Sequence, residues 1–409
     1  MPIRNVPIWL DRYPKSRRPS YPRFRGDLDT EVVIVGGGLT GCVTAWSFAV
    51  AGVKTVLLEA DSIGRGATTE SAGLIREDFD ASFRENAAAH GLRAARTMWQ
   101  TMRRASLDFP AAIRRLGIRC DLAPADCLTF ARAYSENPRL LQREYQSRRE
   151  AGLDHIWLKS AAVSRQAGID SGGAIRTHGF ALDPYRACVG FAAAATSRGA
   201  QLHEDSPVRR IRAGRKQVVV STATGTIRAS AVVVATSPGL ADLRALRRHL
   251  KAIDAYAVVT EPLPAAVRRQ VGSRSSALRD IDIPHHLLRW LKDDRVFFSG
   301  ADQPVVADRA RSKALVQRTG QLMYELSVLY PAISGLQPEW AWSSTHYETV
   351  DRLPFIGLHR NFPRHLFAMG AAQHGAGFAW LAARILLRQY QGEPSKGDDL
   401  FGFSRVLGK

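Results

Sequence analysis

The clearest pattern of apolar and polar positions lies near the start of the chain. Residues 32–35 form a short run of valine and isoleucine, residues 39–50 are mostly apolar without proline, and residues 55–58 form a second apolar run. Short β-branched runs are typical of buried strands, and a longer proline-free apolar stretch is typical of a helix. The pattern therefore predicts a strand, a turn, a helix and a second strand.

The turn between the first strand and the helix has the glycine spacing of a dinucleotide site. Gly36, Gly38 and Gly41 give G-x-G-x-x-G, in which the glycines permit a tight turn, a close approach of the backbone to a pyrophosphate, and close packing of helix on strand. Glu59 follows the second strand and suits the two hydroxyls of a ribose. A glycine-rich structural turn is the alternative, but the full context favours a dinucleotide.

The middle of the chain is predicted to be largely helical and then to return to alternating strands and helices. The pattern from residue 83 to 116 predicts a helix broken near Pro110, and residues 138–150 predict a second, amphipathic helix. Asp183 and Pro184 suit the start of a third helix. Further strands are expected across Pro207, in a hairpin at residues 216–229 and in the valine-rich run at residues 230–237.

The second half of the chain carries strand patterns of a different kind. Between residues 255 and 300 these patterns follow one another without helices, which predicts an antiparallel sheet. A long helix is expected at residues 309–329 and a strand at 340–356. The last third then contains a strand, a group of glycines and a strongly apolar helix from about Ala376.

The strongly basic composition changes this picture little. The chain has 409 residues and a formal net charge of +19 at pH 7. The arginines are scattered through predicted helices and loops and are not interleaved with aromatic residues, so a solvated basic surface is the preferred interpretation and we do not expect a nucleic-acid partner. Attraction of anionic substrates or weak polyanion binding is the alternative.

The cysteines and the lengths of the apolar runs indicate in which cellular compartment the protein is expected. Four cysteines show no paired C-x-x-C spacing, so neither a disulfide framework nor a metal site is expected. No apolar run is long enough for a transmembrane helix, and residues 1–27 lack the apolar core of a signal peptide. We therefore expect a cytoplasmic protein in which residues 1–27 form an extended basic arm.

Several segments, taken together, resemble the FAD-dependent amine and amino-acid oxidoreductases, the superfamily of D-amino-acid oxidase, glycine oxidase and sarcosine oxidase. The resemblance covers residues 30–405, and its motifs occur in the order that the family has them. They are the flavin-wrapping loop GRGATTESAGLI (64–75), the helix and strand at 182–208, VVVATS (232–237), the signature ETVDRLPFIG (348–357), the final flavin-binding turn and helix at 366–386, and DLFGFSR (399–405).

This resemblance implies a set of residues that contact a non-covalently bound FAD. Covalent attachment is not expected, because the wrapping loop contains neither Cys nor His and no Cys follows Cys188. The expected cofactor-binding residues are Gly36, Gly38, Leu39, Thr40, Gly41, Glu59, Ala60, Arg65, Gly66, Ala67, Thr68, Ser71, Gly73, Val208, Ala235, Thr236, Gly357, Gly370, Gly375, Ala376 and Gly377.

The resemblance also implies where the substrate is bound. Arg289 lies in a segment similar to the one that carries a carboxylate-binding arginine in glycine oxidase-like relatives, and an arginine fork suits a carboxylate. Gln373 and His374 are expected at the flavin edge or the substrate, or else only to shape their loop. The further candidates, each with core packing or solvation as the alternative, are His285, His286, Tyr256 and Tyr347. Arg352 replaces the usual signature glycine, which leaves the shape of the pocket rim open.

The predicted architecture is an α/β fold with two parts. A Rossmann-like, doubly wound and mostly parallel FAD-binding domain is expected from residues 28–80, 152–240 and 341–409. An antiparallel α+β substrate domain is expected from residues 81–151 and 241–340.

The leading functional hypothesis is oxidation of the C–N bond of a small amine or amino acid. The resemblance implies hydride transfer to flavin N5, giving an imine that hydrolyses, with the protein orienting and tuning the cofactor. The electron acceptor, oxygen or a carrier, is left open. The alternatives are an NAD-dependent dehydrogenase and a non-catalytic flavin-binding redox or polyanion-binding module.

Overall fold

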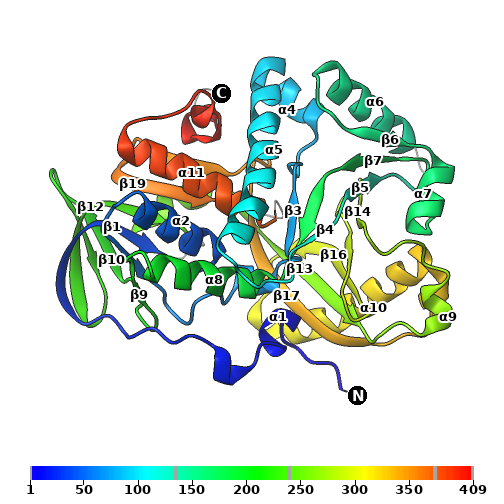
Figure 1. Cartoon of the computed structure of the whole chain (residues 1–409), viewed down its shortest axis with the longest axis horizontal. Helices are drawn as coiled ribbons and strands as arrows, with labels where there is room; N and C mark the ends of the chain where they lie inside the picture. The colour runs from blue at the N-terminus through cyan, green and yellow to red at the C-terminus, as the bar shows by residue number, and fades with distance from the viewer. Residues whose placement is uncertain (1, 133–136, 237–240, 372–374, 407–409) are drawn as a thin grey trace.

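The computed structural model describes residues 2–132, 137–236, 241–371 and 375–406. Two large sheets and one small sheet organise this part of the chain, and Figure 1 shows α2, α8 and α11 with the first sheet in one half and α7, α9 and α10 with the second in the other. The helices are α1 (Ile8–Asp11), α2 (Leu39–Val50), α3 (Ala67–Glu70), α4 (Phe83–His90), α5 (Leu92–Arg115), α6 (Asn137–Glu150), α7 (Ser160–Ala167), α8 (Pro184–Thr196), α9 (Ala265–Arg268), α10 (Asp308–Leu329) and α11 (Gly377–Gln391).

The first sheet has a parallel centre. Strand β1 pairs in parallel with β2 on one side and β12 on the other, and β9 and β19 extend the parallel part. Two antiparallel pairings, β10–β11–β12 and β18–β19, lie beyond β12, and β9 forms the opposite edge. Its strands are β1 (Gly26–Val35), β2 (Thr55–Leu58), β9 (Gln201–His203), β10 (Arg210–Ala213), β11 (Val218–Ser221), β12 (Gly225–Val234), β18 (Phe355–His359) and β19 (Phe362–Met369).

The alternation of side chains along β1 explains why its last four residues, 32–35, are all apolar. Val32 and Ile34 belong to the core shared with α2, α5, α8 and α11, whereas Val33 and Val35 belong to the core on the opposite face of the sheet. A strand buried on both faces needs apolar residues at every position rather than at every second one. This arrangement fixes the end of β1, and with it the glycine turn that follows.

The second sheet is antiparallel except where β14 meets β5. A small third sheet is formed by β3, β8 and β4 and lies where the two halves meet. The strands of the second sheet are β5 (Cys127–Phe130), β6 (Ile156–Leu158), β7 (Ala174–Thr177), β13 (Leu250–Thr260), β14 (Ala277–Asp280), β15 (Leu287–Trp290), β16 (Val296–Pro304) and β17 (Pro338–Thr349); those of the third are β3 (Leu74–Arg76), β4 (Ala123–Pro124) and β8 (Gly179–Ala181). The mixed α/β fold with an antiparallel second sheet confirms the predicted fold class.

The assignment of segments to two domains stays a prediction, and the sheets show where its boundaries would move. Strands β6 and β7 come from the segment 152–240, and most of β17 comes from the segment 341–409. Both segments were assigned to the cofactor domain, yet these three strands belong to the second sheet.

Three local predictions need correction. The helix expected at 83–116 is interrupted at Gly91, whose φ of +86° ends α4, and it continues through Pro110 inside α5, where neighbouring Phe109 and Ala112 are buried. No strand crosses Pro207, because the chain turns at Glu204, whose carboxylate accepts hydrogen bonds from the N–H groups of Tyr21 and Ile63. The strand expected at 340–356 is divided into β17 and β18 by a turn.

The N-terminal arm is more firmly attached than an extended surface segment. It contains the short helix α1, in which Ile8 and Trp9 are buried. The Trp9 indole Nε1–H donates to the carbonyl of Ser71 at 2.9 Å, so the arm holds the loop that follows α3.

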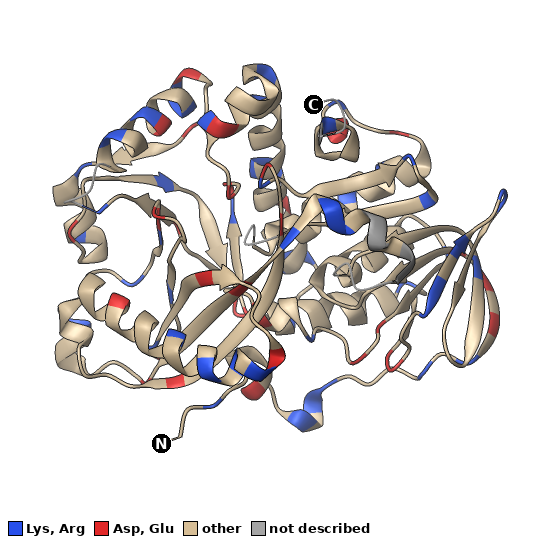
Figure 2. Ribbon diagram, turned by 180° about the vertical axis from the view of Figure 1, so that it is seen from behind, with Lys and Arg blue, Asp and Glu red and all other residues tan. Residues whose placement is uncertain are grey.

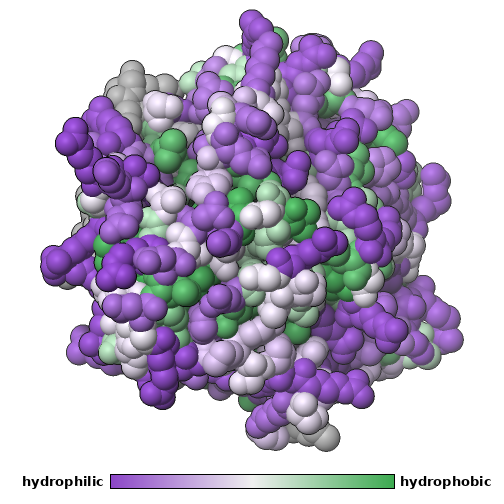
Figure 3. Space-filling model, turned by 60° about the vertical axis from the view of Figure 1, so that its left-hand side comes forward, coloured by the Kyte–Doolittle hydropathy of each residue, from purple (hydrophilic) through white to green (hydrophobic). Residues whose placement is uncertain are grey.

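The basic residues are spread over the surface. In Figure 2 lysine and arginine lie on both halves of the molecule with acidic residues among them, and the face in Figure 3 is largely hydrophilic with smaller apolar areas between. Where the structure describes the chain, no helix is both long and apolar enough to cross a lipid bilayer.

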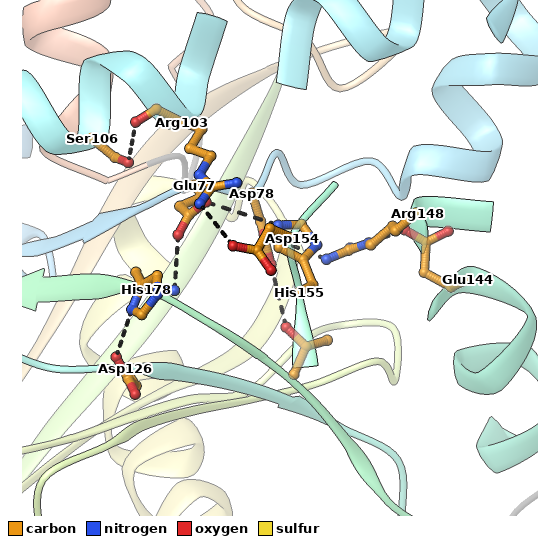
Figure 4. A network of polar contacts seen from close by, with 11 residues as sticks. Glu77, Asp78, Arg103, Ser106, Asp126, Glu144, Arg148, Asp154, His155 and His178 are labelled. Carbon is orange, nitrogen blue, oxygen red and sulfur yellow. Dashed lines mark hydrogen bonds and ion pairs between the residues drawn. The ribbon is translucent and has the colours of Figure 1, made fainter. Parts of the chain in front are cut away.

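A segment of buried charges directly after β3 ties the two halves together. Glu77 accepts the His178 N–H at 2.9 Å and lies 3.4 Å from the Arg103 guanidinium of α5. Asp78 lies 3.5 Å from Arg148 of α6, which also pairs with Glu144 at 2.7 Å (Figure 4). Buried charges require partners, and the partners of Glu77 and Asp78 come from α5, α6 and the turn between β7 and β8.

This network predicts a large difference between two adjacent arginines. Arg148 is buried, pairs with Asp78 and Glu144, and lies 4.3 Å from the centre of the Trp99 ring, whereas Arg149 is exposed. Arg148→Ala leaves two buried carboxylates unpaired and should lower the free energy of unfolding by about 3 kcal/mol. Arg149→Ala should change it by less than about 0.5 kcal/mol. Denaturant unfolding measures both values, and equal effects would contradict the structural role of the network.

Candidate functional site

The glycine turn at the end of β1 brings backbone atoms closer than any side chain would permit. A Cβ atom on Gly41 would lie 1.8 Å from the Gly36 carbonyl oxygen, and one on Gly36, whose φ is +109°, would lie 2.6 Å from the Ala235 carbonyl oxygen. The turn leads into α2, whose first N–H groups and positive dipole end suit an anion. The structure thus places Ala235 and the adjoining Thr236 against the first glycine, while their contact with a cofactor stays a prediction.

Glu59 holds this turn from the end of β2. Its carboxylate accepts the Gly37 N–H at 2.6 Å and the Asp61 N–H at 2.9 Å. The Glu59 carboxylate therefore lies directly beside the glycine turn, at the same edge of the sheet. Ala60 follows it at an exposed position, and Val208 is half-buried against the core on the opposite face of the sheet from α2.

The loop after β2 returns to the start of α2. The Thr68 hydroxyl accepts the Leu39 N–H at 2.9 Å, which joins α3 to the first residue of α2. Gly73 has a φ of +63°, and a Cβ atom there would lie 2.4 Å from the Leu182 carbonyl oxygen. Arg65 instead points outward and pairs with Asp61 at 3.0 Å. The predicted wrapping loop thus follows the cradle closely, while the Arg65 side chain is engaged at the surface.

The turn before α11 meets the strand that follows this loop. The Ala376 N–H donates to the Leu74 carbonyl at 2.7 Å, and Gly375 forms an isolated bridge with Ile75. A Cβ atom on Gly375 would lie 2.3 Å from the Leu74 carbonyl oxygen. The first and last thirds of the chain are therefore in direct contact at this point.

These elements enclose one cavity together with the second sheet. The N-terminus of α2, the loop at 67–74 and the start of α11 form one side, and β13, β15, β16 and β17 form the other. The cavity is lined by Leu39, Thr40, Ala67, Thr68, Glu70, Ser71, Ala72, Gly73, Leu74, Arg76, Ala255, Tyr256, Ala257, Leu287, Phe297, Ser299, Ser344, Thr345, His346, Ala371, Gly375, Ala376, Phe378 and Ala379.

Comparison with known proteins identifies the architecture that builds this cavity. The family pattern described as FAD dependent oxidoreductase matches residues 31–389. The chain belongs to this family. The match also separates the cofactors that the glycine pattern alone leaves open, in favour of FAD over NAD.

Individual members of the FAD-dependent oxidoreductase family are distant from this chain. Gamma-glutamylputrescine oxidoreductase of Escherichia coli is 25% identical over 374 residues, which cover 90% of this chain and 85% of that protein. The probable oxidoreductase OrdL of Haemophilus influenzae is 24% identical, with 90% and 84% covered. The crystal structure of glycine oxidase from Geobacillus kaustophilus superposes with a TM-score of 0.77 at 20% identity, covering 93% of this chain and all of that one. The structural likeness shows the shared fold.

The residues present fit FAD on two observations. The glycines allow the tight backbone turn that leads into the start of α2, and Glu59 stands next to this turn as a ribose partner would. The cavity continues from Leu39 and Thr40 past the wrapping loop to Ala376, so one elongated ligand could contact all three. Gly357 and Gly370 do not line the cavity, since Gly357 packs against Gln389 of α11 and Gly370 packs against Thr349, and their contact with the cofactor stays a prediction. Gly377 starts α11 beside Met102.

Arg289 does not line the cavity. One of its guanidinium nitrogens donates to the carbonyl oxygens of Gly73 and Leu182, at 3.1 and 2.8 Å, and to that of Ala72. Burial lowers its pKa to about 10. The side chain lies beyond the loop, because Gly73 has no side chain to keep it away. This placement does not support the predicted contact with a substrate carboxylate, and a role in holding the loop replaces it.

The two histidines near Arg289 are also engaged away from the cavity. His286 lies between two carboxylates, 2.7 Å from Asp280 and 2.9 Å from Glu325, and stacks on Phe298. His285 lies 3.1 Å from the Asp280 carbonyl oxygen, and burial lowers the pKa of its imidazole to about 3. Both fit the structural alternative rather than a contact with substrate.

Of the two candidate tyrosines, one lines the cavity and the other does not. Tyr256 lines the cavity, and its hydroxyl accepts a hydrogen bond from Gln303 at 2.7 Å, while Tyr347 is not among the lining residues. Arg352 keeps the left-handed backbone of a signature glycine, with a φ of +53°, and its side chain pairs with Glu85. Gln373 and His374 lie outside the described residues.

The cavity also contains charged groups that the motifs did not single out: Glu70, Arg76 and His346. Arg76 pairs with Asp80 at 3.0 Å. Burial opposes a charge on His346, but Glu348, 3.5 Å away, and the charge of Asp302 raise the pKa of its imidazole. Strand β17 carries His346, and only the paired sheet shows that this position faces the cavity. Among the described residues no cluster of His, Cys, Asp and Glu is suited to a metal.

The close approach at Gly41 predicts a sharp effect on cofactor binding. Gly41→Ala forces α2 away from the Gly36 carbonyl, so we expect FAD affinity to fall by at least about tenfold, or more than ~1.4 kcal/mol. Gly320→Ala, in an exposed part of α10 where a Cβ meets nothing within 4 Å, is the matched control and should leave affinity unchanged. Titration of apoprotein with FAD measures both, and undiminished binding by Gly41→Ala would contradict the geometry.

Proposed function

We propose that this member of the FAD-dependent oxidoreductase family oxidises the C–N bond of a small amine or amino acid. The observation that carries the proposal is the single cavity that reaches from the start of α2 to the start of α11 and is closed by the second sheet. The names of the relatives add support, since they include a gamma-glutamylputrescine oxidoreductase and glycine oxidases.

The cradle would hold the cofactor through its backbone. The N–H groups at the start of α2 would receive the pyrophosphate, and Glu59 would receive the ribose hydroxyls. FAD, when bound, supplies a two-electron acceptor that takes a hydride from the substrate carbon. The positive dipole end of α11 opens onto the cavity at Ala376 and Phe378, where it would stabilise negative charge.

The second sheet would receive the substrate. Ser299 offers a hydroxyl group, and His346 offers an imidazole with a raised pKa. Leu287 and Phe297 supply the apolar wall that excludes water from the reacting carbon. This combination suits a small molecule that has both a polar group and a C–H bond to present.

The proposed reaction is tested by mixing the holoprotein with an amine panel under anaerobic conditions. We expect at least one small amine or amino acid to bleach the visible flavin absorbance, because the hydride leaves the substrate carbon for the cofactor. Alcohols of matched size serve as the control and should leave the colour unchanged. Bleaching by NADH or NADPH, with none by any amine, would overturn the proposal.

We also infer that FAD is bound non-covalently. The wrapping loop contains neither Cys nor His, and none of the four cysteines, all at described positions, lines the cavity. Acid precipitation of the holoprotein should therefore release the yellow chromophore into the supernatant. Colour that stays in the pellet after washing would show a covalent bond and contradict the inference.

A cytoplasmic location belongs to the same proposal. All four cysteines are unpaired and buried, which agrees with a reducing compartment.

A further inference from the structure

Glu70 brings a carboxyl group into the cavity on a fixed piece of backbone. It is the last residue of α3 and lines the cavity with the neighbouring Ser71. The Glu70 carbonyl accepts the Trp342 indole N–H at 3.2 Å, and the Ser71 carbonyl accepts that of Trp9 at 2.9 Å. Two indole groups from distant parts of the chain therefore hold the backbone on which this carboxyl stands.

In the described part of the chain, Glu70 forms no ion pair and its side chain makes no hydrogen bond. Burial alone raises the pKa of its carboxyl to about 7. Such a carboxyl is poorly solvated and lacks a counter-ion, so a cation supplied from outside would stabilise its charged form. The cavity therefore offers a place for a positive charge.

The neighbouring cations are engaged elsewhere. The elements that pack against α3 are α1, α8 and β17. Arg12, which follows α1, pairs with Asp293, and Arg186 of α8 pairs with Asp183. Arg76 and His346, which line the cavity, each have a carboxylate neighbour of their own. The other titratable groups on these elements and in the cavity are Asp11, Tyr185, Cys188, Tyr256, Glu339, Tyr347 and Glu348.

We propose that Glu70 binds the ammonium group of the substrate and accepts its proton, so that a neutral amine is presented for oxidation. This inference rests on the proposed function. In the step one N–H bond of the ammonium group breaks, its electron pair stays on nitrogen, and an O–H bond forms on the Glu70 carboxylate. No electron is gained or lost, and the proton leaves to water when the product departs. The substrate class is thus a primary or secondary amine that is cationic in solution.

The inference also explains how a basic protein can select a cation. The net charge of +19 lies on a solvated surface and is screened within about 10 Å at ordinary ionic strength. The Glu70 carboxyl acts at contact distance and is half-buried, so a charge-assisted hydrogen bond there is stronger than one in bulk water. The local group rather than the overall charge decides what binds.

The first test is the pH dependence of flavin reduction. In the wild type, kcat/KM for an amine should rise with pH and level off above about pH 7, where Glu70 is ionised. Glu70→Gln cannot take the proton, so its kcat/KM should keep rising toward the pKa of the free amine, about 10. At pH 7.5 this variant should be at least about tenfold slower, which is the contribution of one charge-assisted hydrogen bond.

Two further variants separate the chemistry from folding. Glu70→Asp keeps a carboxyl group and should keep the levelling near neutral pH at a lower rate. Asp108→Asn removes an exposed acid, paired with Arg104 on α5, and should keep the wild-type profile. A merely structural Glu70 would give the Gln variant a lower rate with an unchanged pH profile, and this result would overturn the inference.

The second test measures binding without turnover. tert-Butylamine has no hydrogen on the carbon next to nitrogen and is a cation below pH 9. Its affinity for the wild type should weaken by about tenfold per pH unit below pH 7, and its affinity for Glu70→Gln should be weaker at pH 8 and independent of pH. Calorimetry on holoprotein and apoprotein gives these values. Equal affinities would refute the role of Glu70 even where no amine in the panel bleaches the flavin, so the two proposals fail separately.

Discussion

The fold depends on one contact between distant parts of the chain. The Ala376 N–H donates to the Leu74 carbonyl, and Gly375 pairs with Ile75 beside it. This contact fastens the start of α11 to the end of the loop that follows the glycine cradle. Because backbone must approach backbone here, only glycine fits at residue 375. Leu74, Gly375 and Ala376 all line the cavity, so this contact closes one side of it.

The sequence predicts the elements around this contact well, because several of their positions can be filled by only one type of residue. The glycines at 36 and 41 are required by positive φ or by close approach, and both requirements leave a recognisable spacing. The last four residues of strand β1, 32–35, are buried on both faces of the sheet and are therefore all apolar. Such features are local, so short stretches of sequence predict them well.

The features that the sequence did not reveal depend on packing between distant segments. Arg289 shares a strand with Leu287, which lines the cavity, yet its guanidinium lies beyond the loop because Gly73 leaves it room. His346 faces the cavity only because β17 pairs with β13 in one register. Pro110 remains inside α5 because the buried helix face outweighs one lost hydrogen bond, while Gly91, with its positive φ, ends the preceding helix. No spacing rule carries this information.

Through the contact between Leu74 and Ala376, the first and last thirds of the chain would meet around one flavin. A crystal structure of the FAD-loaded protein tests it most directly. We expect the pyrophosphate at the start of α2 and the isoalloxazine ring between the loop at 72–74, the start of α11 and the strands β13 and β17. A ring system bound anywhere else, or a cofactor that contacts the cradle without reaching Ala376, would contradict it.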